Sequence, residues 1–431
     1  MKKILLKILH YFLKILAQAI IYKYRPDIIG ITGSVGKTSA AAAIFAILKN
    51  KYKARKNLKN YNNEIGVPLS VIGEETGRKN PLKWLAIFLK TFELLIKTSD
   101  NYPEILVLEM GADKIGDIKY LVKIAKPKIA VVTAIAPVHL EFFGDLKNII
   151  KEKKDILKFL KKDDWLIINN DDQEVRNFVS ATAARQITYG INQPADLLAS
   201  EIKIVKQNEA WGTNFKLSYK GNLVPVFLPN VLGKPQIYAV LAGAAVGIIY
   251  ELNLLEISAA IMNYEPAKSR LHLLGGIKNT LIIDDSYNSS PKAAVEAVEI
   301  LDNFSQPALG RRWAVLGDML ELGNYTEAGH QLVGQKIAQL KNINFLVTIG
   351  ERAKDFKKGA RAGNFPDDHI YSFNNISEAG CFLQENIKKD DLILIKGSQG
   401  VRMEKITKEI MAEPEKAQEL LCRQDGSWLI K

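Results

Sequence analysis

The segment GITGSVGKTS (30–39) contains residues whose types and spacing suit the binding of phosphate. Gly33 and Gly36 would let successive backbone N–H groups approach phosphate oxygens at the start of a helix. The Lys37 amine would reach the outer phosphates, and the Thr38 hydroxyl is suited to ligate Mg²⁺. The strict phosphate-loop motif is not met, because the residue at the first position of that motif is not glycine. The alternative to phosphate binding is a glycine-rich turn that only begins a helix. The expected nucleotide contacts in this loop are Gly33, Ser34, Gly36, Lys37, Thr38 and Ser39.

Three further residues have side chains that could complete a metal and phosphate site. Glu109 ends the apolar run EILVLEMG, His139 follows the run KIAVVTAI, and Lys153 lies in the helical segment KEKKDI. Because strand ends of an open α/β sheet gather in one crevice, Glu109 and His139 are expected to lie near Thr38. A carboxylate and a hydroxyl suit Mg²⁺, although histidine is unusual for so hard an ion. Each residue also has a structural alternative: a helix-cap partner, a packed core histidine and a solvated lysine, respectively. For Lys153, chemistry alone favours the solvated alternative.

The elements that must position these residues alternate between short apolar strands and helices. Such alternation predicts a doubly wound α/β domain with a mostly parallel sheet. The expected strands lie within 27–33, 104–111, 128–135 and 163–172, and the expected helices within 37–50 and 113–127.

The second half of the chain changes in character and then returns to the same alternation. Residues 195–230 have the pattern of antiparallel strands, with hairpin turns expected at 211–213 and 220–222. A helix is expected within 238–252, and the segment 263–276 is expected to be a linker. Further strands are expected within 280–288, 311–319, 344–350 and 390–398. We therefore expect a second α/β domain, Rossmann-like in architecture, towards the C-terminus.

Bulk composition limits the classes of function. The chain has 431 residues, which suggests two or three domains, and a formal net charge of +12, which favours anionic partners. The basic residues are spread along the chain without an arginine-rich arm or a zinc-finger spacing, so nucleic-acid binding is not expected. The two cysteines, Cys381 and Cys422, are far apart, which excludes a disulfide framework and fits a reducing cytoplasm.

The first 25 residues form an apolar segment with a narrow polar stripe. Lysine, histidine and glutamine side chains recur at spacings of three and four, which predicts an amphipathic helix rather than a spanning one. Docking on the body of the protein is the favoured expectation, and peripheral contact with a membrane surface is the alternative. The residues of the stripe are Lys3, Lys7, His10, Lys14 and Gln18.

Several motifs taken together resemble the Mur ligase family. Besides the phosphate loop, they include NYNNEIGVP, LEMGADKIGDI, APVHLEFFG and KEKKDI in the first half of the chain. DDSYNSSP, VLGDMLELG and IKGSQGVRME follow in the second half. The resemblance runs from about residue 27 to the end and implies three regions: an N-terminal helix (1–26), a central ATP-binding domain (27–265) and a C-terminal domain (266–431).

The resemblance implies an ATP-dependent amide ligase of peptidoglycan precursor synthesis. In such an enzyme the acceptor carboxylate takes the γ-phosphate of ATP, and an amine then displaces phosphate from the acyl phosphate. The members that this chain resembles most add D-Ala-D-Ala to a UDP-muramoyl-tripeptide. The resemblance also implies two Mg²⁺ ions and carbamylation of Lys153, which would turn a cation into an oxygen ligand beside Glu109 and His139. This reverses the expectation from chemistry alone for Lys153.

Further site residues are carried over from the resemblance. Arg270 and Asp285 would face the nucleotide, and Asn62 and Asn63 would meet the muramoyl-peptide. Helix capping is an alternative for two residues of the last domain, Asp318 and Ser398. The residues of that domain expected to line the cleft are Asp318, Lys396, Ser398 and Arg402.

The sequence departs from the family pattern at two places. The stretch expected beside adenine reads GKPQIYAV, which leaves Gln236 as the residue that would read the base. The resemblance shows no counterpart of the family's UDP-binding N-terminal domain before residue 27, so we expect the chain to use a partner, to bind UDP weakly, or to take a lipid-linked substrate at the membrane through residues 1–25. A Mur-type ligase with another acceptor or amine, and an ATP-binding partner subunit without ligase activity, are the alternative functions.

Overall fold

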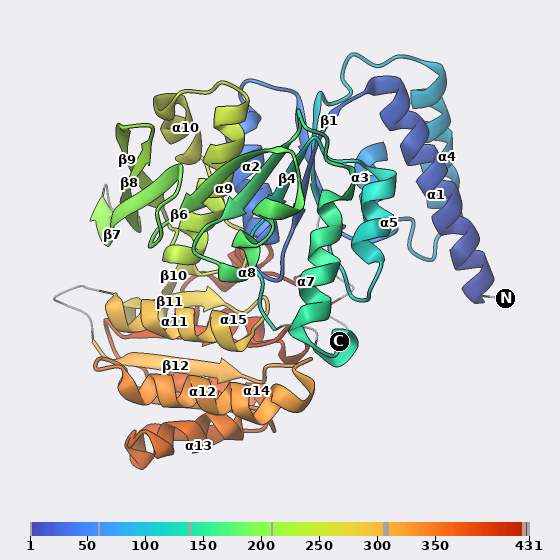
Figure 1. Cartoon of the computed structure of the whole chain (residues 1–431). Coiled ribbons are helices and arrows are strands. Elements are labelled where there is room, and N and C mark those ends of the chain that lie inside the picture. The colour runs from blue at the N-terminus through green and yellow to red at the C-terminus, as the bar shows by residue number, and fades with distance from the viewer. Residues whose placement is uncertain are drawn as a thin grey trace.

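Nine strands form the first sheet, in the order β2-β3-β1-β4-β5-β6-β7-β8-β9 (Figure 1). The computed structural model describes residues 2–58, 61–137, 140–207, 210–304, 310–424 and 428, and side chains from residue 6 onward. In this order, the strands from β2 to β7, which include β1, pair parallel to one another, whereas β7, β8 and β9 pair in antiparallel fashion. The strands are β1 (Asp27–Thr32), β2 (Ala54–Lys56), β3 (Ile105–Glu109), β4 (Ile129–Val132), β5 (Trp165–Asn169), β6 (Arg185–Gly190), β7 (Leu197–Gln207), β8 (Ala210–Tyr219) and β9 (Asn222–Pro229).

Helices cover both faces of the parallel part of this sheet, because alternate strand residues point to opposite faces. Ile29, Val107 and Val131 pack towards α2 and α9, while Ile28 and Leu106 pack in the opposite cluster with α1, α3 and α5. The helices of this half are α1 (Lys2–Tyr24), α2 (Lys37–Leu48), α3 (Gly66–Ile72), α4 (Pro81–Ile96), α5 (Asp117–Ile124), α6 (Leu140–Phe143), α7 (Leu146–Lys154), α8 (Gln173–Arg176), α9 (Lys234–Ile249) and α10 (Leu254–Ile261).

A second sheet of six strands, in the order β10-β11-β15-β12-β13-β14, lies below the first in Figure 1. Only β10 is antiparallel to its neighbour among the described strands of this sheet. Its strands are β10 (His272–Gly276), β11 (Thr280–Asp285), β12 (Arg312–Gly317), β13 (Phe345–Ile349), β14 (Ile370–Phe373) and β15 (Leu392–Lys396). The helices around it are α11 (Pro291–Asn303), α12 (Thr326–Gln339), α13 (Lys354–Ala362), α14 (Ile376–Asn386), α15 (Glu404–Ile410) and α16 (Ala417–Leu420).

These two sheets confirm the predicted α/β class, and the eight segments in which strands were predicted contain β1, β3, β4, β5, β11, β12, β13 and β15, with ends that differ by at most three residues. The turn predicted at 211–213 is wrong, because Gly212 lies inside β8 opposite Pro229. A Cβ at Gly212 would stand 2.2 Å from the Leu228 carbonyl oxygen, so this glycine permits close strand pairing instead of a turn. The turn at 220–222 is confirmed, with positive φ at Lys220 and Gly221.

The linker predicted for 263–276 is wrong in its last five residues. His272–Gly276 form β10, which pairs with β11. The domain boundaries themselves stay a prediction.

Helix α1 packs against the body of the first half, as the favoured expectation for it stated. Leu13, Ala17 and Ile20 are fully buried. The polar stripe is not simply solvated: the Gln18 side chain donates to the Lys123 carbonyl at 2.8 Å, and the Lys14 amine lies 5.4 Å from the centre of the Tyr120 ring. None of the helices in the described part of the chain is long and apolar enough to cross a membrane.

Candidate active site

The phosphate loop joins the end of β1 to the start of α2. Gly33 has φ 145° and Gly36 has φ 85°, which are conformations that favour glycine. A Cβ at Gly33 would stand 2.1 Å from the Thr133 hydroxyl oxygen, so no other residue fits there. The Ser34 side chain bonds to the Ala136 carbonyl at 3.0 Å. The loop is thus held against the segment that follows β4, and its backbone leads directly into the N-terminus of α2.

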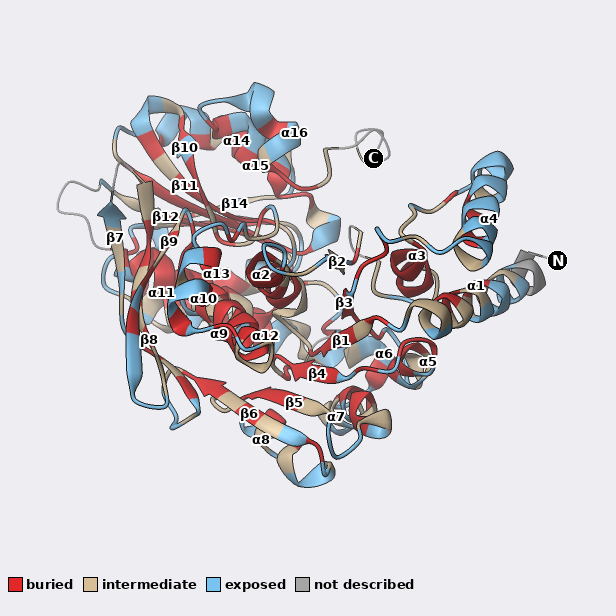
Figure 2. Ribbon diagram, turned by 90° about the horizontal axis from the view of Figure 1, so that it is seen from above, coloured by how far each residue is buried: buried red, intermediate tan, exposed pale blue. Residues whose placement is uncertain are grey.

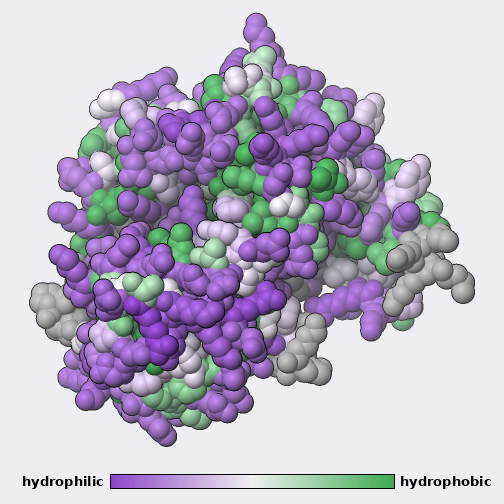
Figure 3. Space-filling model, turned by 60° about the horizontal axis from the view of Figure 1, so that its bottom comes forward, coloured by the Kyte–Doolittle hydropathy of each residue, from purple (hydrophilic) through white to green (hydrophobic). Residues whose placement is uncertain are grey.

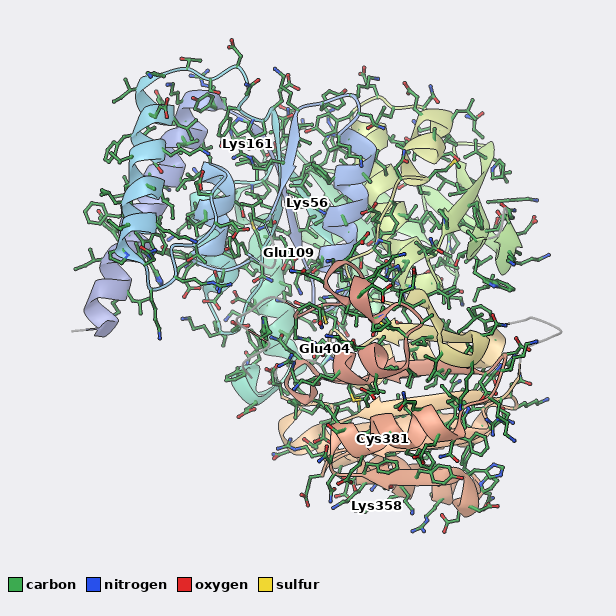
Figure 4. All side chains as sticks on the ribbon, turned by 180° about the vertical axis from the view of Figure 1, so that it is seen from behind. Lys56, Glu109, Lys161, Lys358, Cys381 and Glu404 are labelled. Atoms are coloured by element: carbon green, nitrogen blue, oxygen red, sulfur yellow. The ribbon has the colours of Figure 1, made fainter. Side chains whose placement is uncertain are left out.

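Lys37, Thr38 and Glu109 converge at the end of the first sheet. The Lys37 amine donates to the Gly33 carbonyl at 2.8 Å, and burial lowers the pKa of this amine. The Thr38 hydroxyl donates to Glu109 Oε2 at 2.9 Å, while the Asn62 amide donates to Glu109 Oε1 at 3.0 Å. Figure 4 shows Glu109 at the edge of the first sheet that faces the second sheet. A carboxylate that is only 4% exposed is thereby fixed beside the phosphate loop.

A cavity of about 340 Å³ opens beside this group, between the two sheets. The first half contributes the phosphate loop, Glu109 and residues at the ends of β5 and β6, and the second half contributes residues that follow β11 and β15. Its basic side chains beyond the loop are Arg270, Lys292 and Lys396. The cavity can therefore hold an elongated polyanion, with the phosphate loop at one wall and cations at the other.

Arg270 has an unsatisfied donor in this cavity. Its guanidinium carbon lies 4.3 Å from the centre of the Tyr287 ring, and its Nε is buried without a hydrogen-bond partner. A buried donor without a partner is costly, and an incoming anion would satisfy it. Gln236 lines the same cavity, but its amide donates to the Arg270 carbonyl at 2.9 Å and accepts from the Tyr264 hydroxyl at 2.6 Å. Gln236 thus fixes the segment that carries Arg270.

Asp285 and Lys396 form a buried ion pair at the ends of β11 and β15. The Lys396 amine donates to Asp285 Oδ2 and to the Asn288 carbonyl, the latter at 3.0 Å. Asp285 Oδ1 accepts from the Leu271 backbone at 3.2 Å. Burial raises the pKa of Asp285, and the Lys396 charge opposes this shift. Both side chains line the larger cavity.

A smaller cavity of about 80 Å³ adjoins the larger one, and the two share Ser34, Lys37, Asn62 and Asp113. Lys153, near the end of α7, lines this smaller cavity and is only 4% exposed. Burial and the neighbouring Lys37 charge lower the pKa of Lys153 to about 7, while Glu152, Asp113 and Asp117 oppose the shift. The solvated alternative for Lys153 is therefore wrong. A lysine that is buried beside another cation has the neutral amine available near neutral pH.

Several predicted residues have contacts within the protein. Asn63 lines the smaller cavity and also accepts from the Gly66 backbone at 2.9 Å, where α3 begins. Asp318 accepts from the Ala353 backbone at 2.7 Å next to α13, and Ser398 Oγ accepts from the Leu320 backbone at 2.9 Å. Arg402 pairs with the buried Glu404 and donates to the Trp428 carbonyl.

Among the described residues that line the two cavities, Asp318, Ser398 and Arg402 do not occur. Their place at the cleft surface stays a prediction, and in the structure their polar atoms hold neighbouring loops and helices together. The predicted site residue His139 lies outside the described residues.

Several residues of the larger cavity escaped the sequence analysis, among them Asn169, Tyr189 and Tyr238. Asn169 ends β5, Tyr189 lies near the end of β6, and Tyr238 is on α9 opposite them. The Tyr189 hydroxyl is buried without a partner, whereas the Tyr238 hydroxyl donates to Asp171 Oδ2 at 2.7 Å. The signal that could have found Asn169 and Tyr189 is their position at the carboxyl ends of parallel strands.

The donor set fits a hard divalent cation that shares its coordination with a substrate. Thr38 Oγ1 and Glu109 Oε2 are two oxygen atoms that could ligate a metal, and they lie only 2.9 Å apart at the cavity wall. In the described part of the chain, no group of three or more His, Cys, Asp or Glu side chains could hold a metal by itself. Mg²⁺ is commonly bound through one or two protein oxygens together with substrate phosphates and water, which matches this arrangement.

Comparisons with known proteins agree with this architecture. The family model described as "Mur ligase middle domain" matches residues 89–247, and the one described as "Mur ligase, glutamate ligase domain" matches residues 269–399. The UDP-N-acetylmuramoyl-tripeptide–D-alanyl-D-alanine ligase of Bacillus subtilis is 31% identical over 402 residues, covering 93% of this chain and 79% of that protein. The Escherichia coli enzyme of the same name is 28% identical over 384 residues, covering 88% of this chain and 76% of that protein.

Solved structures give the same result. The MurF ligase of Thermotoga maritima, in complex with ADP, superimposes with a TM-score of 0.76 at 25% identity, covering 94% of this chain and 84% of that one. MurF of Acinetobacter baumannii superimposes with a TM-score of 0.76 at 24% identity, covering 92% of this chain and 79% of that one. Sequence and structure together show that the chain belongs to the Mur ligase family.

Proposed function

We propose that this chain is an ATP-dependent ligase that joins D-Ala-D-Ala to the terminal carboxyl group of a UDP-muramoyl-tripeptide. The observation that carries the proposal is the meeting of the two cavities at Lys37 and Asn62. The larger cavity fits ATP, and the smaller one would receive the end of the acceptor that carries its carboxylate. Relatives that are similar over most of this chain carry the name of this activity.

The basic residues of the larger cavity would neutralise the phosphates of ATP. Lys37, Arg270 and Lys396 face this cavity from the phosphate loop, the segment between the sheets and the end of β15. In phosphoryl transfer, catalysis comes mostly from positioning and charge neutralisation, and these side chains provide both. The acceptor carboxylate then attacks the γ-phosphorus and ADP leaves, after which the dipeptide amine attacks the acyl carbon and phosphate leaves.

Thr38 and Glu109 would hold Mg²⁺ at the boundary between the cavities, and His139 would join them. Bound there, the metal would supply charge stabilisation for the transferred phosphoryl group. We propose further that Lys153 is carbamylated: its neutral amine combines with CO₂, forming an N–C bond and releasing one proton. The product is an oxygen ligand, which is what a second Mg²⁺ requires. Asn62 would position the Glu109 carboxylate through the bond at 3.0 Å.

The proposal is tested with purified full-length protein, ATP, Mg²⁺, UDP-muramoyl-tripeptide and D-Ala-D-Ala. Phosphate release should depend on both the acceptor and the dipeptide, and the product mass should equal that of the joined substrates. Lys37→Ala should abolish this release, while Lys358→Ala, at an exposed lysine of α13, should leave it unchanged. Parallel reactions with single amino acids or other dipeptides test the choice of amine. Phosphate release that does not require D-Ala-D-Ala would refute the proposed amine.

A further inference from the structure

Helices α1 and α4 expose two apolar stripes at one edge of the molecule. The stripe of α4 has a spacing of three and four residues, and each of its side chains is at least half exposed: Leu82, Leu85, Leu89, Phe92 and Ile96. The stripe of α1 consists of apolar and aromatic side chains that are 42–78% exposed: Ile8, Tyr11, Phe12, Ile15 and Tyr22. We call these ten side chains the α1–α4 face. An exposed apolar area of this extent marks an interaction surface.

The two helices form one unit. The Lys23 amine of α1 donates to the carbonyl oxygens of Leu94, Leu95 and Lys97 at the end of α4, at distances of 2.7–3.1 Å. The Tyr24 hydroxyl donates to the Leu94 carbonyl at 2.9 Å. The C-terminal ends of the two helices are therefore joined. Both helices lie beside the first sheet, at the right in Figures 1 and 2, and Figure 2 shows exposed residues along each of them.

The face of α1 that packs on the protein contains the buried Leu13, Ala17 and Ile20, and polar side chains beside them also reach the body. Gln18 donates to the Lys123 carbonyl and Lys14 lies over the Tyr120 ring, while the backbone carbonyl of His10 accepts from the Tyr120 hydroxyl at 3.4 Å. The apolar side chains of the α1–α4 face are left outward. In Figure 3 most of the visible surface is hydrophilic, and hydrophobic side chains appear in several places, among them the right-hand edge, where this pair of helices lies.

Charge identifies the kind of partner. Residues 1–26 contain six lysines and arginines and no acidic residue, and residues 74–98 contain five basic and three acidic residues. Lys90 and Lys97 pair with Glu74 and Glu93, so the net positive charge of this face comes mostly from α1. Lys7 and Lys83 are exposed within the two helices. Apolar and aromatic side chains on a helix that also carries lysines are typical of helices that lie in the interface of an anionic membrane. From this combination we propose that the α1–α4 face binds the surface of a bilayer that contains anionic lipids, without crossing it.

Membrane docking has a consequence for the candidate site. Tyr120, which holds α1 through its hydroxyl, also lines the smaller cavity. The acceptor side of the site therefore lies directly behind α1, whereas the second sheet lies away from this edge. A chain bound through the α1–α4 face would present the smaller cavity near the lipid surface.

The proposal is tested by co-sedimentation of the full chain with vesicles. Wild-type protein should bind vesicles of phosphatidylcholine mixed with phosphatidylglycerol about tenfold more tightly than vesicles of phosphatidylcholine alone, and high salt should remove the difference. The double variants Leu85→Glu/Leu89→Glu and Phe12→Glu/Ile15→Glu should each weaken binding to the mixed vesicles at least about tenfold. The matched control, Leu223→Glu/Leu255→Glu, places the same charges on exposed apolar positions outside this face and should bind like the wild type.

Other outcomes would overturn the proposal. Equal sedimentation of all variants, or none with either vesicle, would show that the α1–α4 face does not bind lipid. Sedimentation velocity without lipid tests a second copy of the chain as the occupant. A dimer that both face variants dissociate, together with absent vesicle binding, would assign the face to self-association. Melting temperatures close to that of the wild type identify the variants that are folded.

Discussion

Glu109 combines burial with two hydrogen bonds that leave its carboxylate oriented towards the phosphate loop. Asn62 and Thr38 each donate to a different oxygen of this carboxylate, so both oxygens have fixed positions. A buried carboxylate needs such partners, because an unpaired charge in the interior is costly. The arrangement lets one side chain serve a structural and a catalytic purpose. In the free protein Thr38 and Asn62 satisfy the carboxylate with hydrogen bonds, and a cation can take the place of the Thr38 proton as its partner.

Replacing Glu109 by glutamine should therefore remove activity without unfolding the chain. The amide keeps the size of the side chain but removes the negative charge, so we expect kcat to fall at least about 100-fold. Phosphate release in the presence of all substrates measures this loss, and far-UV circular dichroism checks the fold. Glu385→Gln, an exposed residue of α14, is the matched control. Activity of Glu109→Gln within a few-fold of the wild type would remove Glu109 from the site.

Lys153 leads to a prediction about pH. Burial and the Lys37 charge lower the pKa of its amine to about 7, and only a neutral amine reacts with CO₂. The neutral fraction rises from about 10% at pH 6 to about 90% at pH 8, so carbamylation should increase across this range. Carbon-13 NMR with labelled bicarbonate should show a carbamate signal that grows from pH 6 to pH 8.

The control for this signal is Lys153→Ala, which should lack it at every pH. Added short carboxylic acids should restore part of the activity of this variant, because they supply the missing oxygen ligand. A carbamate signal of equal size in the variant and the wild type would place the modification on another amine.

The local patterns of the sequence predicted the elements that carry the phosphate loop better than those that complete the cavity. Buried parallel strands such as β3 and β4 are continuous apolar runs, which are recognisable without knowing their partners. In contrast, β10 contains Gly275 and Gly276 and is stabilised by pairing with β11, a contact that local composition does not encode. Gly212 was misread for a related reason: its role depends on the approach of β9.

The site shows the same limit. Motif spacing led to Thr38 and Glu109, and the resemblance to the Mur ligase family led to Lys153; the structure brings these residues to adjoining cavities. The roles of Ser398 and Arg402 could not be predicted, because they depend on loops that are distant in sequence. Tyr189 was missed because a tyrosine within a strand has no local sign of an unpaired hydroxyl. Their roles in the reaction stay predictions.

At the scale of elements, the hydrogen bonds from Lys23 of α1 to the end of α4 should control the local stability of α4. Lys23→Ala removes the cation that satisfies three carbonyls at the end of α4, and hydrogen bonds from charged donors contribute about 1.5–3 kcal/mol. Hydrogen exchange measured by mass spectrometry should become faster in residues 81–99 and stay unchanged in α9. Lys83→Ala, an exposed lysine of α4, is the control. Unchanged exchange in α4 would mean that its apolar contacts alone hold it.

The whole molecule places one cavity between two sheets, so ligand binding should couple them. Arg270 lies in the segment that joins the two halves of the chain, and its neighbours Ser269 and Leu271 have φ of 59° and 53°, which are costly for residues other than glycine. The orientation of this segment is fixed by Gln236 from the first half and by Asp285 from the second. The Arg270 side chain is thereby held at the boundary with an unsatisfied donor.

A non-hydrolysable ATP analogue with Mg²⁺ should slow hydrogen exchange in residues 33–39 and in residues 285–292 together, because both segments line the cavity. In Arg270→Ala the phosphate loop should still be protected at saturating nucleotide, since its own contacts remain. Protection of residues 285–292 should fall several-fold, because the anion loses its link to the second half. Arg352→Ala, an exposed arginine just before α13, is the matched control and should behave like the wild type. Equal protection of both segments in Arg270→Ala would mean that the nucleotide joins the two halves through other residues, of which Lys292 and Lys396 are next to be tested.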